Sequence, residues 1–241
     1  MVLSRLQQLK QSGQKGITYY LLANYPSHEA CLRTIDELVA HGMAALELGL
    51  PAVDPFMDGE IIAGAHAQVM RNGYTDDDLI PLLAKVRARH PQLPIVLMGY
   101  DESFNQPFLR QHTALFDAIL CPERPLLMEG TAHIPFVTAA DDWQTVRQPS
   151  GFVYIGSSKE GTGKGIGSGF ASTLQALRRV TGLPLYVGFG IKNAQHIQRV
   201  LQTGADGVVI GTELIKRVTE DTASRISWLR ENARALKGTI V

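Results

Sequence analysis

Residues 44–59 read AALELGLPAVDPFMDG, a short apolar strand that carries one carboxylate, Glu47, followed by a loop rich in proline and aspartate. A carboxylate inside a buried strand is costly unless it is protonated, paired or used, because removing a charge from water raises its pKa or destabilises the fold. A strand end with one acidic group, running into Asp54 and Asp58, is where an α/β enzyme places acid–base groups. Glu47 therefore needs a functional explanation.

The same strand-then-helix pattern repeats on both sides of this stretch. Apolar runs predict strands at 17–22, 44–49, 93–98, 117–121, 133–137, 151–155, 183–187 and 207–210. Helical patterns lie at 28–40, 61–71, 76–89, 105–112, from about 141, at 171–180, at 194–202, and from 212 toward 236. Eight such strands in a chain of 241 residues favour a closed (β/α)₈ TIM barrel over an open sheet.

Two features modify this barrel. Residues up to about 15 form an amphipathic pattern with Leu3, Leu6 and Leu9 on one face, which predicts an N-terminal capping helix. The connection from strand four to strand five, residues 122–132, holds two prolines and one glycine, so this crossover is shortened and its helix is reduced or absent. No low-complexity linker interrupts the pattern, and we expect residues 1–241 to form a single TIM-barrel domain.

Composition limits the possible functions. The formal net charge is zero, so nucleic acid and anionic membranes are not indicated as partners. No apolar run is long enough for a membrane span and the first residues lack the apolar core of a secretion signal, which predicts a cytoplasmic protein. The two cysteines and seven histidines show no metal-ligand spacing, so no metal is expected and helix-surface or turn positions suffice for the histidines.

Glycines gather at the ends of the last two predicted strands. The segment 188–191 reads GFGI after strand seven, and Gly211-Thr212 follows strand eight just before a helix. Glycine lets backbone N–H groups approach an anion closely, and a helix N-terminus adds partial positive charge. These turns predict the phosphate site of a barrel, with the glycine-rich loop 161–165 placed to close over it.

In its motifs the chain resembles the α subunit of tryptophan synthase over nearly its whole length. The most specific match is residues 47–59, close to the family pattern E-L-G-x-P-x-x-D-P-x-x-D-G. Further matches in the same order are 25–27, 161–163, 188–191 and 211–212.

The resemblance implies retro-aldol cleavage of indole-3-glycerol phosphate to indole and glyceraldehyde 3-phosphate, with indole passed to a β subunit for tryptophan synthesis. Glu47 matches the catalytic general acid–base, and Asp58 matches the aspartate that holds the indole N–H. Implied substrate-binding residues are Tyr20, Tyr154, Thr162 and Phe189, and implied phosphate-binding residues are Gly163, Gly190, Gly211 and Thr212. No cofactor is expected on this chain, since pyridoxal phosphate belongs to the partner β subunit of an expected α₂β₂ heterotetramer.

Several positions depart from the family pattern, and two other functions stay open. Tyr20 replaces the usual phenylalanine, Glu123 the usual aspartate, and Gly99-Tyr100-Asp101 the usual turn after strand three. With the short crossover, these changes leave room for a catalytically weak regulatory or binding subunit of the same complex. Another phosphate-binding barrel, such as a phosphoribosyl isomerase, is a further alternative, although that class is expected to carry Cys or Asp at the first strand end, where this chain has Leu22-Ala23-Asn24.

Overall fold

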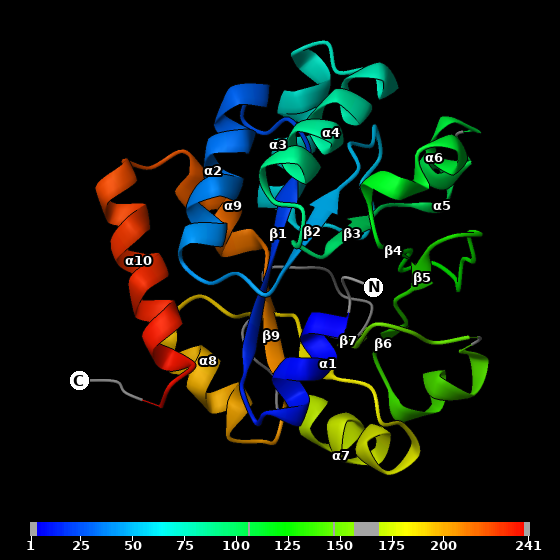
Figure 1. Ribbon diagram of the computed structural model, residues 1–241, viewed down its shortest axis with the longest axis vertical. Coiled ribbons are helices and arrows are strands. Elements are labelled where there is room, and N and C mark those ends of the chain that lie inside the picture. Colours follow the sequence, from blue (N-terminus) through cyan, green and yellow to red (C-terminus); the bar gives the residue numbers. More distant parts are fainter. Residues whose placement is uncertain (1–3, 106, 147, 157–168, 239–241) are drawn as a thin grey trace.

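The alternation predicted from the sequence is present in the computed structural model, which describes residues 4–105, 107–146, 148–156 and 169–238 (Figure 1). The strands are β1 (Gly16–Leu22), β2 (Ala45–Gly49), β3 (Ile95–Met98), β4 (Ala118–Leu120), β5 (Ala132–His133), β6 (Phe136–Val137), β7 (Val153–Ile155), β8 (Leu185–Val187) and β9 (Gly207–Ile210). The α-helices are α1 (Ser4–Gln11), α2 (His28–Ala40), α3 (Glu60–Arg71), α4 (Leu79–Arg89), α5 (Asp101–Phe104), α6 (Pro107–Gln111), α7 (Phe170–Val180), α8 (Ala194–Leu201), α9 (Thr212–Val218) and α10 (Thr222–Ala235). Three short 3₁₀ segments complete the list: η1 (Asp76–Asp78), η2 (Thr113–Leu115) and η3 (Ala140–Thr145).

All strand pairs are parallel, in the order β5-β4-β3-β2-β1-β9-β8-β7-β6. The two end strands of this order are halves of the predicted strand 133–137, separated at Pro135, which has no N–H to donate to a ladder. The Ile134 N–H donates to the Ile119 carbonyl on one side, and the Tyr154 N–H donates to the Pro135 carbonyl on the other. The sheet therefore closes through this segment, and the eight-stranded barrel is confirmed.

Alternation along each strand divides the apolar side chains into two groups. One large cluster lies between the sheet and the helices and includes Leu46 and Leu48. A second cluster fills the barrel interior and includes Ala45, Val96 and Tyr186. Because successive side chains of a strand point to opposite faces, Glu47 faces the interior with Ala45. This orientation gives the predicted acid–base group access to the inside of the barrel.

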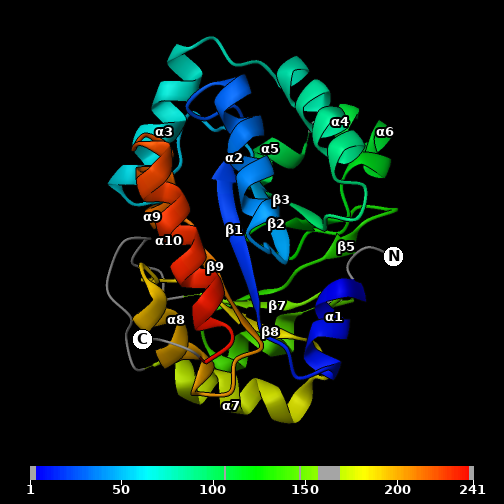
Figure 2. The same ribbon diagram turned by 60° about the vertical axis from the view of Figure 1, so that its left-hand side comes forward.

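The N-terminal capping helix is confirmed, but it ends at Gln11. Leu6 is fully buried in the interior cluster, and the Lys10 ammonium donates to the carbonyls of Gly182 and Leu183, just before β8. Figure 2 shows α1 beside the ends of β7 and β8. The helix therefore closes the amino-terminal end of the barrel, which leaves the carboxyl ends of the strands for the site.

The flank around β4 to β6 departs from the predicted helices. Residues 121–131 contain no helix, as the short crossover predicts. The predicted helix 105–112 is wrong in extent, since the structure has two short helices, α5 and α6, in that region. The helix expected from about residue 141 is also wrong, because η3 is a 3₁₀ segment of six residues whose start is fixed by Asp142 accepting from the Thr138 and Ala139 N–H groups. Figure 1 shows these short pieces on the β5–β6 side, opposite α2, α9 and α10.

The predicted last helix divides in two. α9 ends at Val218, and Asp221 caps α10 by accepting from the Ser224 N–H. Within the described ranges, no helix is long and apolar enough to cross a membrane.

Candidate active site

Glu47 lies on β2 and lines a cavity in the barrel. Its side chain is 1% exposed, and neither carboxylate oxygen has a hydrogen-bond partner among the residues that the structure describes. Burial, reinforced by the charge of Asp58, raises the pKa of Glu47 to about 8. A carboxyl group that holds its proton near neutral pH is suited to act as a general acid.

Asp58 lies in the loop between β2 and α3 and is held by Tyr100, which follows β3. The Tyr100 hydroxyl donates to Asp58 Oδ2 at 2.8 Å and accepts from the Met57 N–H at 3.3 Å. Burial raises the pKa of Asp58 to about 6, while the hydrogen bond from Tyr100 opposes that rise. Two neighbouring carboxyl groups therefore have different pKa values, which is the usual basis for giving them different roles. Sequence reasoning treated Tyr100 only as part of a changed turn and missed this contact.

His66 also reaches Asp58, and the expectation of a surface or turn role for this histidine is wrong. It is 2% exposed on the inner face of α3, one turn after the buried Ile62. The imidazole Nε2 lies 3.7 Å from Asp58 Oδ2 and 3.5 Å from the Tyr20 hydroxyl. Burial lowers the pKa of His66 to about 4. The apolar periodicity of residues 60–71 is the signal that predicts its burial.

Aromatic side chains form the walls around the two carboxyl groups. A cavity of about 270 Å³ is lined by Tyr20, Asp58, His66, Tyr100, Tyr154 and Phe189, among others. Tyr154 donates its hydroxyl hydrogen to the Gly188 carbonyl at 2.9 Å, which fixes its ring. An adjoining cavity of about 90 Å³ shares Tyr20, Asp58, Tyr154 and Phe189 with the first and adds Glu47. The two cavities therefore form one cleft.

The predicted phosphate turns line the second cavity. Gly190, Gly211 and Thr212 all border it, and Gly190 has a φ of 63°, a conformation that favours glycine. Two cations that sequence reasoning missed, Lys192 and Lys216, line the same cavity. Two predicted residues, Thr162 and Gly163, lie outside the described residues. Every other predicted site residue borders this one cavity.

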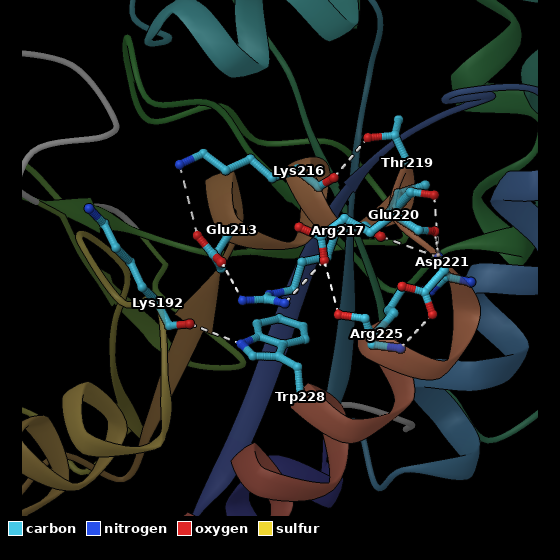
Figure 3. A network of polar contacts seen from close by, with 11 residues as sticks. Lys192, Glu213, Lys216, Arg217, Thr219, Glu220, Asp221, Arg225 and Trp228 are labelled. Carbon is cyan, nitrogen blue, oxygen red and sulfur yellow. Dashed lines mark hydrogen bonds and ion pairs between the residues drawn. The ribbon is translucent and has the colours of Figure 1, made fainter.

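A polar network supports the cation-lined end of the cleft (Figure 3). The Trp228 indole N–H donates to the Lys192 carbonyl at 2.9 Å, and the Arg217 guanidinium lies 5.1 Å from the Trp228 ring centroid. Arg217 also pairs with Glu213 at 3.0 Å in the first turn of α9. Figure 3 shows the side chains of Lys192 and Lys216 on the same side of this network, with the Lys216 ammonium paired to Glu213 at 3.9 Å. Trp228 of α10 therefore contacts both the turn after β8 and α9, and it fixes their relative position.

The arrangement suits a particular kind of ligand. Aromatic walls match a planar ring, two carboxyl groups of different pKa match proton transfer at that ring, and glycine turns with two lysines match an anionic tail. No cluster of His, Cys, Asp and Glu among the described residues has the arrangement of a metal site.

Comparison with known proteins agrees with this site. A sequence model of the family described as tryptophan synthase alpha chain matches residues 6–116 and 129–239. The intervening residues 117–128 hold β4 and most of the helix-free connection after it. The stretch that the family model leaves unmatched therefore lies on that flank of the barrel.

Similar proteins include the tryptophan synthase alpha chain of Chloroflexus aggregans, 31% identical over 93% of both chains. The Erythrobacter litoralis protein of the same name is 31% identical over 86% of this chain and 87% of its own. The structure of Mycobacterium tuberculosis tryptophan synthase has the same fold, with a TM-score of 0.86 at 22% identity over 98% of this chain and 97% of that chain. The alpha subunit from Legionella pneumophila gives a TM-score of 0.85 at 23% identity over 99% and 98%.

These matches cover nearly the whole chain. The chain therefore belongs to the tryptophan synthase alpha chain family, and it is the α subunit in tryptophan biosynthesis, an enzyme of the lyase class.

Proposed function

We propose that this cleft cleaves indole-3-glycerol phosphate to indole and glyceraldehyde 3-phosphate through Glu47 and Asp58, and that indole then passes to a β subunit. The observation that carries the proposal is the position of Glu47. Its buried carboxyl has no donor among the described residues and shares one cavity with Asp58, Gly190 and Gly211. A buried carboxyl without a hydrogen-bond partner is expected to gain one only when the substrate binds.

Glu47 supplies both proton transfers of the retro-aldol step. Its carboxyl group, protonated near neutral pH, delivers the proton to C3 of the indole ring. The carboxylate so formed takes the proton from the adjacent hydroxyl of the glycerol chain while the C3–carbon bond breaks. The electrons of that bond return to the indole ring, so the residue begins and ends the cycle protonated.

Asp58 stabilises the positive charge that appears on the indole nitrogen when C3 is protonated. Its ionised form accepts the indole N–H, and the Tyr100 hydroxyl keeps Oδ2 in place. Tyr20, Tyr154 and Phe189 pack against the ring. For Thr162 and Gly163 we retain the roles that the resemblance implies, orientation of Asp58 and contact with the phosphate.

The phosphate is held by the backbone at Gly190, Gly211 and Thr212, with Lys192 and Lys216 adding positive charge. A Cβ built at Gly211 lies 3.3 Å from the Tyr20 Cβ, so a bulky residue there narrows the cleft.

Gly211→Val is expected to raise KM for indole-3-glycerol phosphate roughly 10- to 100-fold, which corresponds to losing about one hydrogen bond to a charged group. Steady-state kinetics with indole-3-glycerol phosphate measure this change in KM. Gly182→Val is the matched control, since a Cβ at Gly182 contacts nothing within 4 Å. Equal KM values for the two variants would contradict the phosphate assignment.

The proposed partner is a tryptophan synthase β subunit in an α₂β₂ heterotetramer, with the whole α chain acting as a single barrel domain. The α reaction needs no cofactor in this proposal, and pyridoxal phosphate belongs to the β subunit. Indole release from indole-3-glycerol phosphate, measured with and without a β subunit, tests the function. Strong stimulation by the β subunit is the expected result, whereas a pair that releases no indole would favour the regulatory hypothesis.

The pH profile follows from the two carboxyl groups. Asp58 acts in its ionised form, so kcat/KM should rise as pH increases through about 6. Glu47 acts in its protonated form, so kcat/KM should fall as pH increases through about 8. We expect a bell with its maximum near neutral pH when the complex is assayed from about pH 5 to 9. A profile that keeps rising to the alkaline end would contradict the assigned role of Glu47.

A further inference from the structure

The hydrogen bond made by one ring nitrogen of His66 determines where its proton lies. The Ala52 backbone N–H donates to His66 Nδ1 at 3.0 Å. A nitrogen that accepts a hydrogen bond carries no hydrogen itself, so the neutral ring holds its proton on Nε2. Protonation of the ring would add a hydrogen to Nδ1, and this N–H would then face the Ala52 N–H, so that two donors oppose each other. The backbone of the loop after β2 therefore fixes both the tautomer and the neutral state.

The Nε2–H of His66 faces two groups of the cleft. Tyr20 Oη lies 3.5 Å away and Asp58 Oδ2 lies 3.7 Å away. The same Oδ2 accepts from Tyr100. Tyr20 is also the residue that pairs with Glu47 across β1 and β2. One imidazole thus connects the loop backbone, the ring-binding tyrosine and the carboxylate assigned to the indole nitrogen.

We infer that His66 is a positioning residue of the α reaction: a neutral imidazole fixed by the Ala52 N–H, whose Nε2 lies at hydrogen-bond distance from the Tyr20 hydroxyl and packs beside Asp58, and which so holds both groups in their catalytic orientation. The inference rests on the proposed role of Asp58. A neutral imidazole suits this task, because it donates a hydrogen bond without adding a charge that would compete with the developing charge on the indole ring. Since Ala52 and Asp58 belong to one loop, the imidazole also joins the start of that loop to its end.

Two substitutions distinguish the role of Nδ1 from the role of Nε2. In His66→Asn the side-chain oxygen replaces Nδ1 as an acceptor for Ala52, but no donor remains at the position of Nε2. In His66→Gln the amide nitrogen reaches the position of Nε2 and restores the donor. For the complex with a β subunit we expect His66→Asn to lower kcat roughly tenfold with little change in KM, and His66→Gln to recover part of that loss. His41→Asn, at the remote end of α2, is the matched control and should keep full activity.

A double-mutant cycle with Asp58→Asn tests whether His66 acts through Asp58. If it does, His66→Asn should change kcat by less than about twofold in the Asp58→Asn background, measured under single-turnover conditions. An equal loss in both backgrounds would overturn the inference, as would full activity of His66→Asn. In either case, a low activity of the single variant Asp58→Asn would still support the proposed function. An active Asp58→Asn would overturn the role of Asp58 and this inference with it.

A measurement on the unchanged protein keeps the inference testable if a variant fails to fold. Nitrogen-15 NMR of histidine-labelled chain should show the His66 ring as the neutral tautomer protonated on Nε2 from about pH 5 to 8. A ring protonated on Nδ1, or one that titrates within this range beside Asp58, Tyr20 and Tyr100, would overturn the inference.

Discussion

Glu47→Gln is expected to lower kcat for indole release by about 10² to 10⁴-fold, the range of a lost general acid–base. Glutamine has almost the same shape but neither gives a proton to C3 nor accepts one from the hydroxyl. Because the phosphate turns and the aromatic walls stay unchanged, binding of indole-3-glycerol phosphate should remain measurable. Rapid-quench turnover together with calorimetric binding would separate the two effects.

Protein stability provides an independent check on the same variant. A carboxyl group whose pKa rises from 4.5 to about 8 on folding binds more protons in the folded state, so it lowers stability as pH increases through that window. Glu47→Gln should therefore be at least as stable as the unchanged chain above neutral pH. The exposed Glu60→Gln is the matched control and should alter neither turnover nor this pH dependence. Near-normal turnover by Glu47→Gln would remove Glu47 from the chemistry.

Asp58→Asn is expected to lower kcat by about 10² to 10³-fold, the size of effect seen when one preorganised electrostatic contact to a developing charge is removed. The amide oxygen can still accept from Tyr100, so the geometry should hold while the negative charge is lost. The exposed Asp77→Asn serves as the control for removing an aspartate charge.

The pH profile of Asp58→Asn provides a second readout. The acidic limb should disappear, because the group that causes it is gone. The alkaline limb should move to lower pH, since the charge of Asp58 is one of the two causes that raise the pKa of Glu47. An unchanged alkaline limb would mean that the two carboxyl groups do not interact.

The barrel and most of the site were predictable because they depend on local patterns. Apolar runs of strand length mark every barrel strand, and Glu47 stands out as the one carboxylate within the second of them. The side of the sheet that it faces is decided by the structure. The helices around residues 105–112 and 141–145 were predicted less well, because short helices depend on packing and capping rather than on periodicity. Pro135 interrupts a strand that nevertheless closes the barrel, since only its carbonyl is needed.

The contacts around Asp58 could not be read from the sequence. Tyr100 reaches it from the turn after β3 and His66 from α3. Lys192, from the turn after β8, and Lys216, from α9, line one cavity. No local pattern relates such positions, because their distances are set by how barrel units pack around one axis. His66 shows the difference most clearly. The sequence predicts a helix-surface or turn position for it, whereas the structure buries it, and the Ala52 N–H decides which ring nitrogen keeps the proton.

The sequence by itself determined the order of the barrel strands, the presence of a carboxylate within a buried strand at residue 47 and the glycines at two strand ends, because these follow from apolar runs and backbone freedom. Only the tertiary structure decided which polar groups surround those carboxyls, and therefore their pKa values. Burial and hydrogen-bond partners set the proton affinity of a side chain, and both are supplied by segments far away in the sequence.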